Sequence, residues 1–377
     1  MKNFSYLTAA ALLVLGGCKS ETNEEGFVDK ANTISFSAYS AKTRAYTSGD
    51  VANIDNMKEG SFGVVGYTAD NNIYLGSASK AIEQHWNGTI WDYATASDLK
   101  YWPAGAMDFY AYFPYSASGG VFAESDASGN VMTITNNTGN QDVLFARQAN
   151  VSQTTYVPLY FKHALSKIKS VKIKVNAVDV KVTVKGIKFL NTSTKGVIKV
   201  ANDGNASYGT TNEPRSFDFS ASPKEIEYNN DEGDEGVALF SNEDNGYVFA
   251  TNTSLEHNVK GTGKTMWTAG DKTSLGGGNL SASNFVVMEL ECRVEAAGHY
   301  LVGSADTYGT MYIPMHGTSS NSADITELLA GRRYTYKVVM TSNVGYKDDG
   351  DPIMLAPIRF SVNEVPEWND VEVTINL

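Results

Sequence analysis

Short runs in which hydrophobic and polar residues alternate dominate the chain, and clusters of Gly, Asn, Asp and Ser separate these runs. An alternation with a period of two places successive side chains on opposite faces of a β-strand. The pattern therefore predicts an all-β protein built from many short strands. The strands are expected at residues 33–39, 61–67, 107–113, 171–175, 180–184, 285–294, 334–338, 358–362 and 371–377.

Helical signals are sparse by comparison. One short helix is expected over residues 324–330, because Asp324 suits the N-cap position and Glu327 stands three residues later. Gly331 follows and can end the helix, since glycine adopts the left-handed conformation found just past helix C-termini. Many strands with turn residues between them are typical of β-sandwich proteins.

The N-terminus has the pattern of a signal peptide. Lys2 supplies a positive charge, residues 6–15 form an apolar stretch, and two glycines precede Cys18. The sequence Leu15-Gly-Gly-Cys18 resembles the lipobox of bacterial lipoproteins, in which the chain is cut before the cysteine and its sulfur carries a diacylglycerol. The apolar stretch is shorter than the roughly 20 residues that a membrane span needs. We therefore expect lipidation at Cys18; an ordinary signal peptide with an incidental cysteine is the alternative.

Four segments are expected along the chain. Residues 1–17 form the lipoprotein signal peptide, and residues 18–32 form a polar, acidic tether that resembles the surface-export signal of Bacteroidetes lipoproteins. Near residue 165, aromatic-rich and lysine-poor segments give way to strands in which lysine alternates with valine or isoleucine. The expected fold is all-β, with two β-sandwich (transthyretin-like) domains in tandem at residues 33–165 and 166–377.

Composition narrows the classes of partner. A hydrophobic content of 42% supports a packed core, and the net charge of −12 argues against nucleic acid as a partner. The chain has two cysteines, so lipidation of Cys18 leaves Cys292 without an intrachain partner. Cys292 belongs to an alternation with Val286, Met288, Leu290 and Val294, which predicts a buried and unreactive thiol on the apolar face of a strand.

Motifs for catalysis or cofactor binding are not evident. Gly261-Thr-Gly-Lys-Thr265 lacks the first glycine of a phosphate-binding loop, because residue 258 is asparagine. The acidic runs 231–235 and 347–351 lack the spacing of a calcium-binding loop. We therefore expect no enzyme activity, no cofactor and no metal site. The histidines are far apart and show no zinc-binding spacing: His85, His163, His257, His299 and His316.

The aromatic residues allow a second class of function, carbohydrate binding. Trp86, Trp91 and Trp102 could form platforms on which sugar rings stack, as in a surface carbohydrate-binding lipoprotein. Packing in the core is the alternative for these side chains, because Trp102-Pro103 precedes an expected strand. A secreted glycosidase is a third class, although its carboxylate pair is not recognisable in a sequence.

An ordered set of segments resembles the fimbrillin family of Bacteroidetes, the subunits of lipoprotein-derived pili. The set covers nearly the whole chain. It consists of Leu15 to Cys18, Ile34-Ser-Phe36, Thr43-Arg44-Ala45, Tyr101-Trp102-Pro103, Phe109-Tyr-Ala-Tyr-Phe-Pro114, Phe161-Lys-His-Ala-Leu-Ser-Lys167, Gly331-Arg-Arg-Tyr-Thr-Tyr336 and Trp368.

The resemblance implies a structural pilus subunit that supports adhesion. A precursor with a lipid anchor in the outer membrane is cut by an arginine-specific protease, between Arg44 and Ala45 in this chain. The cut removes the strand that carries Ile34, Phe36 and Ala38. A strand from another pilus subunit then fills the open groove head-to-tail, which builds an extracellular fimbrium.

Two features of the residues agree with this implication. Arg44 is the first of seven arginines, and it lies just beyond the expected strand 33–39. At the other end, Val371, Val373, Ile375 and Leu377 form one apolar row of a candidate donor strand. The alternatives are an ordinary exposed arginine and a last strand that stays in its own sandwich.

Overall fold

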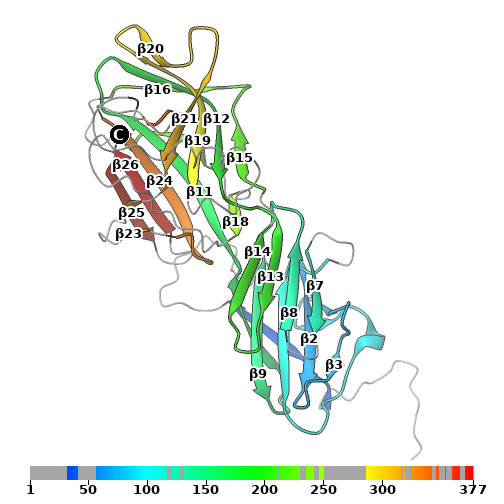
Figure 1. The fold of residues 1–377 in the computed structure, drawn as a ribbon. Coiled ribbons are helices and arrows are strands. Elements are labelled where there is room, and N and C mark those ends of the chain that lie inside the picture. The colour runs from blue at the N-terminus through cyan, green and yellow to red at the C-terminus, as the bar shows by residue number, and fades with distance from the viewer. Residues whose placement is uncertain are drawn as a thin grey trace, which may run out of the picture.

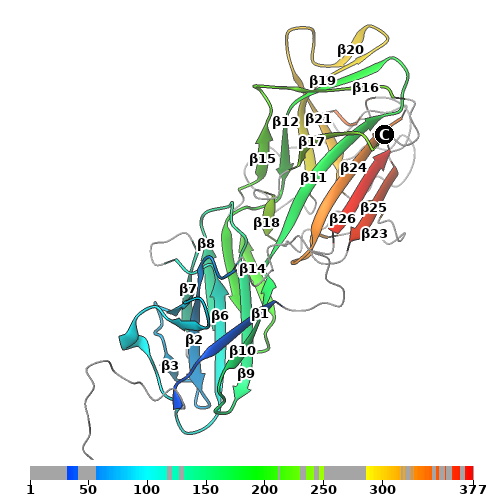
Figure 2. The ribbon, with the colours of Figure 1, turned by 180° about the vertical axis from the view of Figure 1, so that it is seen from behind.

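The computed structural model describes residues 32–40, 57–116, 121–126, 131–210, 213–229, 235–241, 246–249, 286–315, 317–318, 324–325, 327–341, 345–347, 353, 359–365 and 370–376. These residues form an all-β structure, as the alternation predicts, and the 3-10 turn η2 (Ala96–Asp98) lies outside the sheets. Figure 1 shows two lobes that follow one another along the molecule, and Figure 2 shows the same lobes from behind. No helix in the described ranges is long and apolar enough to cross a membrane.

The first lobe is built on an eight-stranded sheet. The sheet curves so that β1, at one end of the strand order, contacts β5 at the other end. The order is β1 (Phe36–Ser40), β10 (Val157–His163), β9 (Leu144–Val151), β6 (Met107–Phe113), β2 (Ser61–Thr68), β4 (Ile82–Trp86) and β5 (Trp91–Tyr93), and β3 (Ile73–Leu75) pairs with β2.

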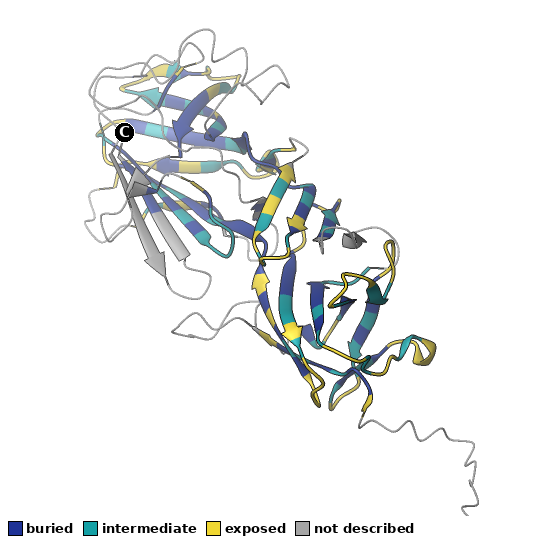
Figure 3. Cartoon of the chain, turned by 60° about the horizontal axis from the view of Figure 1, so that its bottom comes forward, coloured by how far each residue is buried: buried dark blue, intermediate teal, exposed yellow. Residues whose placement is uncertain are grey.

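Alternate residues of this sheet enter two separate cores. Phe109 and Ala111 of β6 face one core, together with Phe62 of β2, and this core also receives the first strand. Tyr110 and Tyr112 of β6 face the other core. Period-two alternation produces this division, because successive side chains of a strand point to opposite faces. Figure 3 shows buried residues, in dark blue, along the strands of both lobes.

A four-stranded sheet covers the second of these faces. Ile134 of β8 and Ile198 of β13 share a core with Tyr110 and Tyr112, so the two sheets form a sandwich. The order is β14 (Ala206–Thr210), β13 (Gly196–Val200), β8 (Val131–Asn136) and β7 (Val121–Asp126).

The hairpin of β13 and β14 corrects the expected division of the chain. A boundary near residue 165 assigns residues 196–210 to the C-terminal domain, whereas β13 pairs with β8 of the first lobe, from Gly196↔Asn136 to Val200↔Met132. The chain thus crosses into the second lobe, returns for one hairpin and crosses again. Local alternation marks this hairpin as strands but carries no information on which sheet it joins.

The second lobe is a sandwich of two six-stranded sheets. One sheet has the order β17 (Val237–Ser241), β11 (Leu165–Val175), β24 (Arg333–Met340), β26 (Asp370–Asn376) and β25 (Arg359–Val365), with β18 (Tyr247–Phe249) paired to β11. The other has the order β15 (Arg215–Asp218), β12 (Val180–Leu190), β19 (Val287–Ala296) and β20 (His299–Val302), with β16 (Lys224–Glu227) paired to β12 and β21 (Gly309–Pro314) paired to β19.

The core between these sheets contains Cys292. Its side chain is 0% exposed on β19, in a row with Met288, Leu290 and Val294, which confirms the prediction from the alternation. Burial raises the pKa of the Cys292 thiol well above its ordinary value, with a smaller contribution from the charge of Glu291. The thiol therefore stays protonated and packs as a small apolar group.

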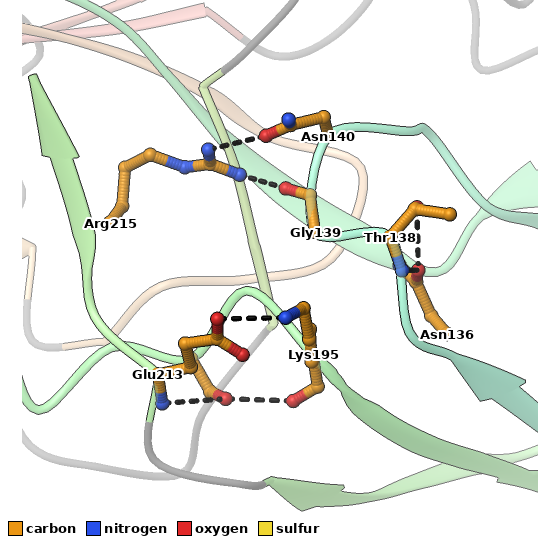
Figure 4. A network of polar contacts seen from close by, with 8 residues as sticks. Asn136, Thr138, Gly139, Asn140, Lys195, Glu213 and Arg215 are labelled. Atoms are coloured by element: carbon orange, nitrogen blue, oxygen red, sulfur yellow. Dashed lines mark hydrogen bonds and ion pairs between the residues drawn. The ribbon is translucent and has the colours of Figure 1, made fainter. Parts of the chain in front are cut away.

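A buried arginine joins the second lobe to the first. Arg215, at the start of β15, donates hydrogen bonds to Asn140 Oδ1 over 2.7 Å and to the carbonyl oxygen of Gly139 (Figure 4). The loop that bears these acceptors follows β8, and the backbone N–H of Thr138 donates to Asn136 Oδ1 within it. Burial lowers the pKa of Arg215 to about 10. The guanidinium is still charged at neutral pH, so its two acceptors hold the lobes in contact.

The expected short helix is wrong. Asp324–Ile325 forms β23, which pairs with β22 (Gly317–Thr318), and residues 327–331 are not helical. Tertiary partners take the backbone groups that a helix would use. The N–H of Leu329 donates to Tyr334 Oη over 2.8 Å, and the N–H of Gly331 donates to the carbonyl of Leu165 over 2.8 Å. A helix of this length is too short to compete with such contacts.

Candidate functional site

The first strand is held on both sides by backbone hydrogen bonds. Residues 32–34 pair with residues 100–102: the N–H of Ile34 donates to Lys100 O over 2.9 Å, and the N–H of Trp102 donates to Asn32 O over 3.0 Å. From Phe36 onward, β1 runs parallel to β10, with Phe36 opposite Val157 and Ser40 opposite Phe161 (Figure 2). The segment 32–40 therefore closes the gap between the two ends of the curved sheet.

Three side chains of this segment lie in the core. Ile34, Phe36 and Ala38 are 0%, 1% and 7% exposed, so the apolar row that the sequence indicates faces inward. The Phe36 ring meets Phe109 and Phe62 edge-on, with centroids 5.5 and 6.3 Å apart. Burial of a phenylalanine or isoleucine side chain contributes about 1.5–3 kcal/mol to stability. Loss of this segment would open the core and leave the β10 edge without its partner.

A tyrosine from the other end of the curved sheet binds the same segment. Tyr93 Oη, on β5, donates a hydrogen bond to the carbonyl oxygen of Ile34 over 2.8 Å. Burial is the main reason that the pKa of Tyr93 is raised. The hydroxyl therefore stays protonated and can donate at all ordinary pH values. On the outer face, the ring of Tyr39 stacks on Tyr160, with centroids 5.3 Å apart at an angle of 25°.

The tryptophans do not form an exposed row among the described residues. Trp91 is 4% exposed, and Trp86 and Trp102 are partly buried against the same core as Phe36. Trp102 packs edge-on against Phe109, with centroids 5.8 Å apart. The carbohydrate-binding alternative therefore lacks the aromatic platform that these three residues would have provided.

The arginines other than Arg44 lie in described segments where the backbone is paired. Arg332, in the turn before β24, donates its N–H to Leu329 O over 3.2 Å, and its carbonyl accepts the N–H of Lys167 over 2.9 Å. The other five lie within strands: Arg147 in β9, Arg215 in β15, Arg293 in β19, Arg333 in β24 and Arg359 in β25. Proteases cut most readily at exposed, unpaired segments, so these six positions are poor substrates in the folded protein.

The C-terminal strand occupies the interior of its sheet. β26 lies between β24, to which it is parallel, and β25, to which it is antiparallel. Val373 and Ile375 are fully buried in the core of the second lobe. Val371 lies at the start of the strand, opposite Tyr334. The sequence does not reveal the central position of this strand, because alternation does not distinguish an inner strand from an edge strand.

Several expected site residues lie outside the described residues. These are Cys18, Arg44, Ala45 and Leu377. The expected site residues that the structure does describe are the inward row of the first strand and most of the last strand. These two strands belong to different sheets in different lobes. In the described part of the chain, no group of three or more His, Cys, Asp or Glu side chains gathers in an arrangement that could hold a metal ion.

Comparisons with known proteins give one family match and several similar solved structures. A family model described as Fimbrillin-like matches residues 43–351, a range that begins after β1 and ends before β25. A solved fimbrial protein from Bacteroides vulgatus is similar, at 15% identity and a TM-score of 0.46, over 91% of this chain and 97% of that chain. A candidate cell adhesion protein from Parabacteroides distasonis has 10% identity and a TM-score of 0.44, over 92% of this chain and 97% of that chain. No curated protein matches.

Proposed function

The chain belongs to the fimbrillin-like family, and we propose that it is a structural subunit of a cell-surface pilus that supports adhesion. In this proposal the precursor is exported as a lipoprotein, anchored through Cys18 in the outer membrane, and cut between Arg44 and Ala45 by an arginine-specific protease. Subunits then polymerise head-to-tail by strand exchange into an extracellular fimbrium. The subunit has a structural role, and its partners are other subunits of the same or a related kind.

The observation that carries the proposal is the position of β1. A cut after Arg44 separates the segment 32–40 from the rest of the chain, although the segment remains held by hydrogen bonds and by Ile34 and Phe36. Its departure leaves unpaired backbone groups on β10 beside an open apolar core. Both changes cost free energy, so a strand from a second subunit is favoured in the vacated place.

The scarcity of accessible arginine supports Arg44 as the processing site. The other six arginines lie in paired backbone, where a protease cannot draw the chain into an extended, unpaired conformation. Arg44 stands beyond the end of β1 at Ser40. An arginine-specific enzyme would thus have one favoured site in the folded subunit.

The C-terminal strands are the candidate donor. Withdrawal of β26 alone would break its ladders with both β24 and β25. β25 is the edge strand of this sheet. If β25 and β26 leave together, only the ladder between β26 and β24 breaks, and β25 and β26 stay paired with each other. We propose that this hairpin leaves as a unit and presents Val371, Val373, Ile375 and Leu377 to the next subunit. A subunit that both gives and accepts a strand makes a contact that does not close, and a filament results.

The test uses purified precursor and an arginine-specific protease. N-terminal sequencing of the product should give Ala45, and electron microscopy should show filaments. Arg44→Lys keeps the charge but removes the cleavage site, so it should stay monomeric, whereas Lys42→Ala should assemble like the wild type. If the wild type is cut after Arg44 and remains monomeric at high concentration, the strand-exchange proposal is wrong.

Anchoring is tested separately. Cys18→Ala should abolish acyl labelling of the precursor in cells, because it removes the cysteine that directly follows the signal peptide. Cys292→Ala is the matched control and should label like the wild type. Equal labelling of the Cys18→Ala precursor would contradict lipidation at this position.

A further inference from the structure

One polar side chain is buried in the core that receives the first strand. Gln84 lies on β4 and is 0% exposed. It shares a face with Ile82 and Trp86, both of which belong to this core or pack against it. Neither Nε2 nor Oε1 of Gln84 has a hydrogen-bond partner among the described residues. Buried amides of this kind are rare in native proteins and call for an explanation.

The neighbours of Gln84 place it beside the segment 32–40. In the strand register, Gln84 stands opposite Phe62 on β2 and opposite Tyr93 on β5. Phe62 meets the Phe36 ring, and Tyr93 Oη donates to the carbonyl of Ile34. Both cross-strand neighbours of Gln84 therefore contact the first strand directly.

A second unpartnered group lies along the same segment. Trp102 Nε1 is buried without a hydrogen-bond partner among the described residues. The backbone N–H of Trp102 donates to Asn32 O, and its ring packs on Phe109, which also contacts Phe36. Two donor groups and one acceptor atom, each without a partner in the described part of the chain, are thus buried among residues that contact the first strand.

The native first strand cannot satisfy these groups. Its alternating inward row consists of Ile34, Phe36 and Ala38, none of which has a polar side-chain atom. The buried hydroxyl of Thr33 belongs to the opposite alternation and lies 3.5 Å from Ser35 Oγ. Leaving a buried amide unpaired costs free energy in the uncut subunit. A strand with a hydroxyl or amide in its inward row would remove that cost on entering the groove. Replacement of the native first strand by such a strand would then be favoured over the reverse replacement.

We propose that Gln84, with Trp102, selects the incoming strand by hydrogen bonding to a Ser, Thr, Asn or Gln side chain in its inward row. This inference rests on the proposed strand exchange. The C-terminal strand of this chain offers Val371, Val373 and Ile375 in its apolar row, and so cannot pair with the amide. A second copy of this chain can fill the groove by strand exchange, whereas a related subunit with a polar side chain in that row should therefore bind more tightly.

The test measures the binding of synthetic strands to the cut subunit. Peptides with the sequence of residues 33–40 carry Ile34→Thr or Ile34→Val, which differ by one hydroxyl in place of one methyl group. A second pair carries Phe36→Gln or Phe36→Met. Each pair is measured on wild-type protein and on Gln84→Met, which keeps the volume of the side chain and removes its hydrogen bonds. A double-mutant cycle then isolates the contact with Gln84.

The expected result is specific to the amide. For at least one pair, the preference for the polar peptide should be about fivefold greater on wild type than on Gln84→Met, which corresponds to about 1 kcal/mol. The uncut Gln84→Met precursor should also melt at a higher temperature than the wild type, because the unpaired amide is gone. Gln84→Leu provides a second apolar variant for both measurements if Gln84→Met does not fold.

Two failures can be told apart. Suppose that wild-type cut protein binds the unchanged 33–40 peptide, but each pair shows the same preference for the polar peptide on wild type and on Gln84→Met. The selecting role of Gln84 is then wrong and strand exchange stands. An uncut Gln84→Met precursor that melts at or below the wild-type temperature also overturns the role of Gln84. If the cut protein binds none of the peptides, strand exchange itself fails, and the selection fails with it.

Discussion

Tyr93 Oη donates a hydrogen bond to the carbonyl oxygen of Ile34 over 2.8 Å, and this bond joins β5 to the segment ahead of β1. The two residues are far apart in the chain, and neither would suggest the other in a sequence. Because β5 contacts β1 and β10 pairs with it, the phenol provides a second attachment of the first strand besides the ladder with β10. A bond of this kind stabilises the uncut subunit and resists departure of the strand after cleavage.

Tyr93→Phe should therefore weaken the hold on the first strand. The uncut protein should lose about 1 kcal/mol of stability, the usual net contribution of one hydrogen bond, plus the cost of an unpaired Ile34 carbonyl. After cleavage at Arg44, the N-terminal fragment that ends at Arg44 should dissociate faster, as measured by size exclusion and mass spectrometry. Tyr74→Phe is the matched control, since Tyr74 Oη also donates to a backbone carbonyl, that of Tyr101, at an exposed site. Equal dissociation rates for both variants would contradict this role of Tyr93.

Phe36 should make the largest side-chain contribution of the first strand. Phe36→Ala leaves a cavity next to Phe62 and Phe109, so the uncut first lobe should lose about 3–5 kcal/mol. Urea unfolding followed by tryptophan fluorescence measures this loss, because Trp91 belongs to the same core. The control is Tyr39→Ala in the same strand, where the ring is 47% exposed and a loss below about 1.5 kcal/mol is expected. Similar losses for the two variants would show that the inward row does not dominate.

Cys292 should be unreactive in the native protein. Protein cut after Arg44 has lost Cys18, so Cys292 is its remaining cysteine. Burial raises the pKa of this thiol, and the reactive thiolate is scarce. A water-soluble alkylating agent should label it slowly until denaturant is added, and mass spectrometry follows the reaction. Cys292→Ser should cost about 1–3 kcal/mol, because a hydroxyl takes the place of an apolar thiol. Rapid labelling of native protein would contradict the burial.

Two tyrosines, the half-buried Tyr208 and the buried Tyr346, should make the protein sensitive to alkali. Burial raises the pKa of both Tyr208 and Tyr346 to about 12, whereas an exposed tyrosine in the unfolded chain titrates near pH 10. The fold favours the protonated phenols, so their contribution is complete below pH 10 and is lost as the pH rises from about 10 to 12. The free energy of unfolding should fall by up to about 1.4 kcal/mol per pH unit for each residue.

Urea titrations at pH 9, 10 and 11 measure this slope. Tyr208→Phe should make it shallower, since the variant has no phenol to ionise in β14. Tyr39→Phe, at an exposed ring, should leave the slope as it is in the wild type. A free energy of unfolding that stays constant over this pH range would contradict the effect of burial.

Local alternation was sufficient to place strands and to orient their side chains. The expected strand 107–113 is β6 itself, and the rows through Cys292 and through Phe36 face the cores as the period of two indicates. The expected helix at 324–330 failed because its polar pattern resembled a capped helix while its backbone groups found partners elsewhere. Short-range signals describe the chain's preference, and tertiary hydrogen bonds can override it.

The sequence by itself determined the all-β class, the inward rows of the strands and the positions of Cys18 and Arg44 along the chain. Tertiary structure alone decided which strands pair. β1 lies parallel to β10, the hairpin of β13 and β14 returns to the first lobe, and β26 lies inside its sheet. The same step placed Gln84 between Phe62 and Tyr93, both of which contact the first strand. The reason is physical: alternation encodes which face of a strand is buried, whereas the choice of partner depends on contacts between residues far apart in the chain.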